Sequence, residues 1–171
     1  QSTLIKDTSR PTTVKNRIYN ENEYVLRFDK ESIEPVSSKI EKEILERLQG
    51  ILEKEDFDTA ILQDYNKGFF SSKIIKKCIS LLKEKEVKIV VDPKKENFFA
   101  YKGVDLFKPN LKEVSMALNI EISPKIKQHL KLACSQLMDK LNCQNVLLTL
   151  SEYGAVWYDE EDFLHFAAAK S

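Results

Sequence analysis

The 171-residue sequence is long enough for one domain with a hydrophobic core, and its 27 lysine and arginine residues are balanced by 27 aspartate and glutamate residues. That balance excludes a general basic field, so we expect no nucleic-acid partner and no attraction to an anionic membrane. With 42% hydrophobic and 32% charged residues, and no apolar run near the roughly twenty residues of a membrane span, the sequence predicts a soluble folded chain.

The cysteines and histidines indicate a cytoplasmic protein without a metal or disulfide framework. Cys78, Cys134 and Cys143 are odd in number and lack the CxxC spacing of zinc sites, so we predict three reduced thiols. His129 and His165 are too few for a metal site or a catalytic triad, and we predict surface or structural roles for both. The sequence starts at Gln1 without a signal peptide, so we expect further residues upstream.

The first predicted element is a β-hairpin formed by residues 13–19 and 24–29 around the polar turn 20–23. Alternation in a strand places successive side chains on opposite faces. One face of the second strand therefore carries the apolar residues Tyr24, Leu26 and Phe28.

Two cations of this hairpin form a candidate phosphate site. Lys15 and Arg17 are two residues apart in a strand, so both project to one face. There they can neutralise the phosphate of a sugar held beneath the hairpin. The alternative is an exposed cationic face without a ligand.

Beyond the hairpin, apolar strands alternate with amphipathic helices, which predicts a largely parallel sheet of right-handed βαβ units, an α/β fold of the Rossmann type. The predicted helices span residues 37–53, 71–86, 111–118 and 124–141, and the predicted strands span 57–62, 87–91, 104–107 and 145–150. Residues 155–158 and 163–166 are predicted to close the sheet as an antiparallel pair around an acidic turn.

In open α/β sheets the ligand lies beyond the carboxyl ends of the strands, so the polar residues that follow each strand are candidates. Within residues 64–68, Asp64 and Lys67 can hold a sugar hydroxyl and a phosphate; the alternative is an ordinary loop. After the next strand, Asp92 can face a metal-bound nucleotide and Lys94 a phosphate; the alternative is a helix cap followed by solvated lysines.

Two later strand ends carry similar candidates. Asn110 and Glu113 lie on one side of a first helical turn and can orient magnesium-bound waters, or they can form a capping box. In residues 149–154, hydroxyl and N–H groups can line an adenine-nucleotide pocket, or the segment is a turn that needs Gly154 for its backbone angles.

Taken in order, these segments resemble the ribokinase-like (phosphofructokinase B-type) carbohydrate kinases, most closely the kinase domain of the bacterial heptose-7-phosphate kinases. The resemblance spans nearly the whole chain. It implies a three-layer α/β sandwich with a mostly parallel sheet and a hairpin lid, incomplete at both ends, with the lid at residues 11–30 and the core at 37–171. It is carried by residues 11–17, 27–29, 64–68, 92–94, 109–113 and 148–154.

The resemblance implies phosphorylation of heptose 7-phosphate to the 1,7-bisphosphate, with ATP and Mg²⁺, in ADP-heptose and lipopolysaccharide core synthesis. The protein chemistry of such a transfer is positioning and charge neutralisation. By position, the nucleotide side comprises Asn110, Leu111, Lys112, Glu113, Thr149, Ser151 and Gly154, with Glu113 toward the metal. The substrate side comprises Lys15, Arg17, Asp64, Lys67, Asp92 and Lys94. The lid is also implied to form a homodimer interface.

The sequence departs from this family at both ends. The family's glycine-rich sugar-binding strand does not precede residue 1, and its glycine-rich anion hole with the catalytic aspartate does not follow residue 171. No carboxylate here is therefore assigned as general base, and we predict that this polypeptide alone is inactive.

Alternatives remain open at this point. The chain can be the ordered part of a longer kinase, a truncated polypeptide, or a split or decayed kinase that needs a partner chain. It can also be a non-catalytic α/β dimerisation module, or a kinase of another sugar or of a nucleoside.

Overall fold

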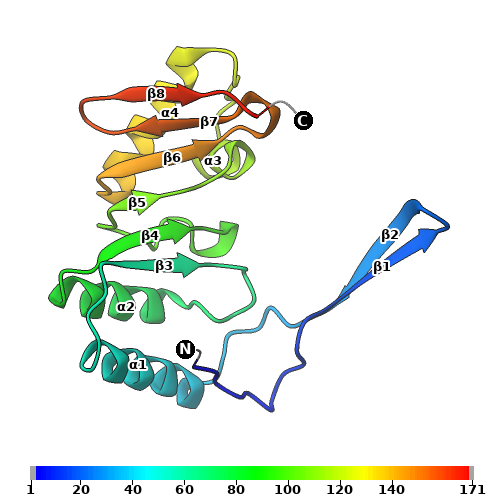
Figure 1. Cartoon of the computed structure of the whole chain (residues 1–171), viewed down its shortest axis with the longest axis vertical. Coiled ribbons are helices and arrows are strands. Elements are labelled where there is room, and N and C mark those ends of the chain that lie inside the picture. The colour runs from blue at the N-terminus through cyan, green and yellow to red at the C-terminus, as the bar shows by residue number, and fades with distance from the viewer. Residues whose placement is uncertain (1–2, 170–171) are drawn as a thin grey trace.

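The computed structural model describes residues 3–169, in which a hairpin projects from a six-stranded α/β core (Figure 1). The strand order in the core is β3-β4-β5-β6-β7-β8. The first four of these strands are parallel, and the last two are antiparallel to their neighbours. They are β3 (Thr59–Gln63), β4 (Lys88–Asp92), β5 (Leu106–Phe107), β6 (Asn145–Thr149), β7 (Ala155–Tyr158) and β8 (Phe163–Phe166). The mostly parallel sheet is thus confirmed.

Four α-helices and two short 3₁₀ turns in the described chain connect these strands: α1 (Ser38–Leu52), α2 (Ser72–Glu84), α3 (Leu111–Leu118), α4 (Lys127–Leu141), η1 (Lys95–Asn97) and η2 (Ser151–Tyr153). The hydroxyls of Ser37 and Ser71 accept hydrogen bonds from the third residue into α1 and α2, as N-caps do. Local capping chemistry therefore sets where both helices begin.

Two predicted elements are shorter than expected. The helix predicted from residue 124 begins at Lys127, after a turn that contains Pro124. The strand predicted from residue 104 is reduced to β5, because the Asp105 carboxylate accepts the Ile89 backbone N–H at 2.8 Å in place of a main-chain carbonyl. The side chain thus replaces a bond of the sheet ladder.

All the helices lie on one face of the sheet. The strand order advances in one direction from β3 to β6, and right-handed crossovers then place every connecting helix on the same side. That face carries the fully buried core residues, such as Ile89, Phe107 and Val146, packed against α2 and α4. The described chain therefore supplies the sheet and one helical layer of the expected sandwich.

The opposite face of the sheet is apolar but outside the core. The strand registers place Ile61, Val90 and Leu106 in one row and Leu147 and Trp157 in another. None of these belongs to a buried cluster, and Ile61 is 67% exposed. We call this surface the open sheet face. Its exposure is unusual for a parallel sheet, which is normally covered on both faces.

The predicted hairpin is confirmed as β1 (Val14–Asn20) and β2 (Glu23–Lys30). One face carries charges, with Lys15 opposite Asp29 and Arg17 opposite Arg27, and the other face is mainly apolar. Both strands are almost wholly exposed, and Figure 1 shows the hairpin extending away from the core on two stems.

The remaining composition-based expectations concern thiols, histidines and membrane spans. The three cysteines have free thiols and are buried, and burial raises their pKa values, for Cys78 to about 11. His129 and His165 are exposed, as predicted. Among the described helices, none combines the length and the apolar content that crossing a bilayer requires.

Candidate active site

The polar residues that follow β3, β4, β5 and β6 meet along one edge, because the carboxyl ends of parallel strands lie together. The last two ends are joined directly: the backbone N–H of Thr149 donates to the Pro109 carbonyl at 3.0 Å. Asn110 also pairs with Thr149 in an isolated parallel bridge. The start of α3 is thereby fixed beside the end of β6.

The Asn110 and Glu113 pair forms the capping box that was one of its two interpretations. The Asn110 side chain accepts the Glu113 N–H at 2.8 Å, and Glu113 Oε2 accepts the Asn110 N–H at 2.9 Å. Glu113 Oε1 is bonded by Lys94 Nζ at 2.5 Å. Capping thus orients the Glu113 carboxylate toward the end of β4.

The residues around Glu113 limit the kind of metal site it can belong to. Within residues 3–169, no cluster of three histidine, cysteine, aspartate or glutamate side chains could hold a metal ion. A single carboxylate such as that of Glu113 fits Mg²⁺ only in its usual nucleotide-bound form. In that form the ion takes one or two protein carboxylates and its remaining ligands come from phosphates and waters. Glu113 remains the predicted carboxylate for that role.

A cavity of about 610 Å³ lies between the start of α3 and η2. It brings together Asn110, Leu111, Lys112 and Ser151 from the predicted nucleotide set, and its other lining residues are Ser115, Met116, Ile122, Leu150, Glu152 and Tyr153. Thr149, Glu113 and Gly154 are not among its lining residues, and Glu113 lines a separate cavity of about 740 Å³ with residues 95–100. Tyr153 lies in the predicted segment 149–154 but was not named as a site residue; an aromatic residue in a 3₁₀ turn after a strand is the signal that could have found it.

Gly154 has a structural role that its position in the cavity loop did not reveal. Its φ angle is 87°, and a Cβ built there would lie 1.9 Å from the Phe166 carbonyl oxygen. Both features require glycine. The structure therefore favours the alternative in which Gly154 serves the turn, where β7 begins against β8.

Asp92 is held by neighbours from both adjacent strand ends. Its Oδ2 accepts from Gln63 Nε2 at 2.7 Å and pairs with Lys108 Nζ at 3.3 Å. With Lys94 paired to Glu113, the middle of the edge contains two separate ion pairs. Each lysine pairs with a carboxylate, although the Lys94 side chain is still 38% exposed.

Asp64 is 2% exposed and serves the loop that follows β3. Its Oδ1 accepts the Asn66 N–H at 2.7 Å, and its Oδ2 accepts the hydroxyl of the fully buried Tyr101 at 2.8 Å. The same oxygen is 3.4 Å from Asn97 Nδ2. These bonds favour a loop-holding role for Asp64, and Tyr101 is the partner that sequence reasoning missed.

A second cavity, of about 730 Å³, lies between the base of the hairpin and the end of β3. It brings together Lys15 and Lys67, two of the predicted substrate residues. Its other lining residues are Thr13, Ile61, Gln63, Tyr65, Phe69 and Phe70. Lys67 also pairs with Glu31 of the hairpin stem. We call this space the hairpin cavity; Arg17 lies farther along β1 and does not line it.

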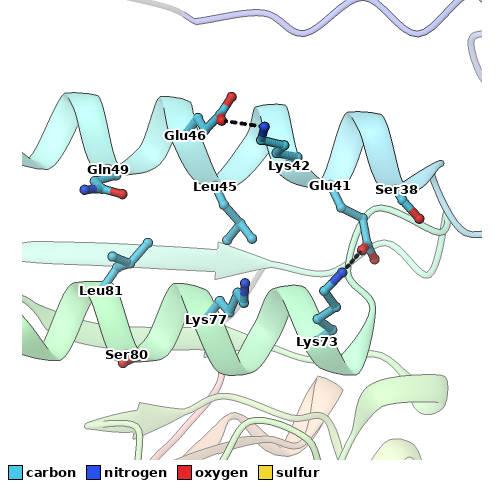
Figure 2. A pocket seen from close by; sticks show the side chains of 10 residues that line it. All are labelled: Ser38, Glu41, Lys42, Leu45, Glu46, Gln49, Lys73, Lys77, Ser80 and Leu81. Carbon is cyan, nitrogen blue, oxygen red and sulfur yellow. Dashed lines mark hydrogen bonds and ion pairs between the residues drawn. The ribbon is translucent and has the colours of Figure 1, made fainter.

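Another hollow, of about 590 Å³, lies between α1 and α2 and is distinct from the strand ends (Figure 2). Glu41 on α1 pairs there with Lys73 on α2 at 3.0 Å, to one side of the apolar side chains Leu45 and Leu81. No residue that lines it comes from a strand end. Because its lining residues lie on α1 and α2, this hollow results from the packing of the two helices and is not part of the candidate site.

Comparison with known proteins finds bacterial relatives of this chain. The chain is 35% identical over 159 residues to the bifunctional protein HldE of Aliarcobacter butzleri, and the aligned region covers 93% of this chain and 33% of the relative. It is 36% identical over 158 residues to HldE of Helicobacter hepaticus. The chain thus spans about a third of the length of the curated relatives it matches. No protein-family model matches the sequence.

Solved structures support the same fold. Phosphofructokinase-2 of Escherichia coli in complex with fructose-6-phosphate matches with a TM-score of 0.70 and 20% identity, covering 93% of this chain and 51% of that structure. The ribokinase of Giardia lamblia matches with a TM-score of 0.68 and 13% identity, covering 95% and 49%. At these identities the likeness concerns the fold.

Proposed function

Because the chain is a homologue of the HldE proteins with the fold of the ribokinase-like sugar kinases, we propose that it supplies the phosphate-binding edge of an ATP- and Mg²⁺-dependent sugar kinase. The proposed acceptor is a heptose 7-phosphate, and the proposed product is the 1,7-bisphosphate. The resemblance to heptose-7-phosphate kinases supports this choice of sugar.

The observation that carries the proposal is the presence of two separate cavities along one sheet edge. The hairpin cavity, with Lys15 and Lys67, lies at the end of β3. The cavity between α3 and η2, with Asn110 and Ser151, lies beside β6. A sugar phosphate suits the first because two ammonium groups can neutralise its phosphate. A nucleotide suits the second, where backbone and hydroxyl groups gather at a helix start.

The residues between the two cavities would bind the phosphoryl group during its transfer from the nucleotide to the sugar. Three strand spacings, about 14 Å, separate β3 from β6, and the ends of β4 and β5 lie in between. Lys94 and Lys108 are there, each held by a carboxylate. Mg²⁺ would supply charge neutralisation beside Glu113 when bound with the nucleotide. Positioned cations of this kind stabilise the negative charge of the phosphoryl group in the transition state of its transfer.

We expect this polypeptide alone to lack turnover. The carboxylates at the strand ends are engaged: Asp64 by Tyr101, Asp92 by Lys108, and Glu113 by its capping box. A general base must reach the proton it removes from the acceptor hydroxyl. Asp64, Asp92 and Glu113 are therefore poorly placed to act as that base.

The hairpin supports a second part of the proposal, a homodimer formed through its apolar face. Leu26 and Phe28 are 44% and 55% exposed, and Ile18, opposite Leu26, is 44% exposed. An isolated two-stranded hairpin is marginally stable in water, so covering this face would stabilise it. The proposed setting of the enzyme is the cytoplasm.

The test is a kinase assay on a longer polypeptide that contains this sequence, with heptose 7-phosphate and ATP. Lys15→Ala and Lys67→Ala should each raise KM for the sugar phosphate about 10–100-fold, the equivalent of roughly 1.5–3 kcal/mol for a charged hydrogen bond. KM for ATP should stay unchanged, and Lys42→Ala, in the α1–α2 hollow, is the control. Failure to phosphorylate any sugar phosphate would overturn the proposal.

A further inference from the structure

The connection between the hairpin and the core depends on very few apolar contacts. Of residues 3–36, only Ile5 and Val36 pack against a buried cluster of the core. The hairpin strands themselves are almost wholly exposed. Something other than hydrophobic packing must therefore set the direction in which the hairpin projects (Figure 1).

One side chain joins the three segments that meet at the base of the hairpin. Arg10, on the incoming stem, donates to the Ser32 carbonyl at 2.8 Å and to the Glu34 carbonyl at 3.2 Å, both on the returning stem. It also donates to the carbonyl of Lys67, in the loop that follows β3. A planar guanidinium with five donors can make such a set of bonds, whereas an ammonium group cannot match its geometry.

The same loop touches the returning stem at a second place. The Val36 N–H donates to the Gly68 carbonyl at 2.9 Å. Gly68 has a φ of 72°, and a Cβ there would lie 1.8 Å from the Glu34 carbonyl oxygen. The stem therefore lies directly against the loop, at a distance that only glycine allows.

Some buried polar groups near this joint lack hydrogen-bond partners even with Arg10 in place. Within residues 3–169, the buried side-chain oxygens that lack a hydrogen-bond partner are Asp7 Oδ2, Asp29 Oδ1 and Glu31 Oε2. All three belong to the hairpin or its stems. Buried polar atoms without partners are costly, so the joint has little reserve if further bonds are lost.

We propose that Arg10 is a positioning residue that holds the hairpin at a fixed angle over the hairpin cavity. Its bonds to Ser32 and Lys67 place one wall of the cavity, which contains Lys15, against the other, which contains Lys67. Arg10 is not itself among the lining residues. It therefore acts through the residues that would bind the phosphate, and this part of the inference relies on the proposed function.

The experiment measures the hairpin angle without relying on activity. Spin labels are attached at Asn22→Cys, in the hairpin turn, and at Lys54→Cys, just after α1, in the whole chain. The native cysteines are buried with raised thiol pKa values and should stay unlabelled. We expect one narrow distance distribution for the parent chain. Arg10→Ala should at least double its width.

Two further variants test whether the planar geometry of the Arg10 guanidinium or only its positive charge sets the hairpin angle. Arg10→Lys keeps the positive charge and should also broaden the distribution, because the three donors of an ammonium radiate from one nitrogen and do not match the planar spread of the guanidinium. Gly68→Ala should broaden or shift it with Arg10 intact, and it serves if Arg10→Ala fails to fold. Arg17→Ala, which changes an arginine farther along β1, opposite Arg27, is the matched control and should leave the distribution unchanged.

An unchanged width in Arg10→Ala, or a parent-like width in Arg10→Lys, would overturn the inference. In the kinase assay, Arg10→Ala should raise KM for the sugar phosphate at least tenfold while KM for ATP changes less than twofold. If the distribution broadens but no sugar phosphate is ever phosphorylated, the proposed function fails and the positioning role of Arg10 stands.

Discussion

The buried hydrogen bond between Tyr101 and Asp64 makes a prediction that can be followed quantitatively. Tyr101→Phe removes only the hydroxyl, which lies 2.8 Å from Asp64 Oδ2, and leaves the ring in the core. Because Asp64 is 2% exposed, water cannot easily replace the lost donor. The substitution should therefore destabilise the chain and loosen the loop after β3.

The expected size follows from the chemistry of the bond. A hydrogen bond to a charged group contributes about 1.5–3 kcal/mol, and the remaining donors to Asp64 limit the loss to this range. For a chain of this size, each 1 kcal/mol lowers Tm by about 2–4 °C, so Tyr101→Phe should lower Tm by roughly 3–12 °C.

Urea unfolding and thermal melting of Tyr101→Phe measure this loss. Tyr65→Phe is the matched control, because Tyr65 is 62% exposed and its hydroxyl deletion should change the free energy of unfolding by less than about 0.5 kcal/mol. Combining Tyr101→Phe with Asp64→Ala should show a coupling energy of about 1 kcal/mol or more.

Equal stability of Tyr101→Phe and the control, together with a coupling energy near zero, would refute this reasoning. The hydroxyl and the carboxylate would then be neighbours without a stabilising bond. The loop after β3 would have to be held by Asn97 and the hairpin stem alone.

Three other substitutions test separate parts of the structure. The hydrogen bond from Ser71 Oγ at 2.7 Å is the main cause that holds the pKa of Glu41 below its usual 4.5. The unfolded state therefore binds more protons than the folded state as the pH falls. The stabilisation is complete above pH 4.5 and is lost as the pH falls through the lower pKa of the folded state. Glu41→Gln should flatten this acid limb in urea titrations from about pH 6 to about pH 3. Gly154→Ala, with its Cβ 1.9 Å from the Phe166 carbonyl, should lower the free energy of unfolding by more than about 2 kcal/mol in the same assay. Ile61→Thr, on the open sheet face, should cost less than about 0.5 kcal/mol and reduce the binding of a hydrophobic dye.

Each of these has a contrary result. A parent-like acid limb in Glu41→Gln would show that the bond from Ser71 does not stabilise the folded state. Wild-type stability of Gly154→Ala would show that β8 can move away from the turn. A large loss of stability in Ile61→Thr would show that the open sheet face is packed in solution, for example by a second copy of the chain.

The candidate site divides into contacts that are local in sequence and contacts that are not. The capping box of Asn110 and Glu113 was predictable as one of two interpretations, because both residues lie in one helical turn. The pairing of Lys94 with Glu113 was not predictable, because 19 residues separate them and a strand order had to be known first. The same holds for Arg10 and Lys67, which are 57 residues apart.

By itself, the sequence determined the elements of this protein: the hairpin, the alternation of strands and helices, and the polar residues after each strand. Periodicity and capping encode these because they depend on neighbours within one or two turns. The tertiary structure alone decided which strand ends face each other, that Asp64 is buried against Tyr101, and that the helices cover one face of the sheet. These features arise from strand order and crossover handedness, which bring together side chains that no local pattern connects.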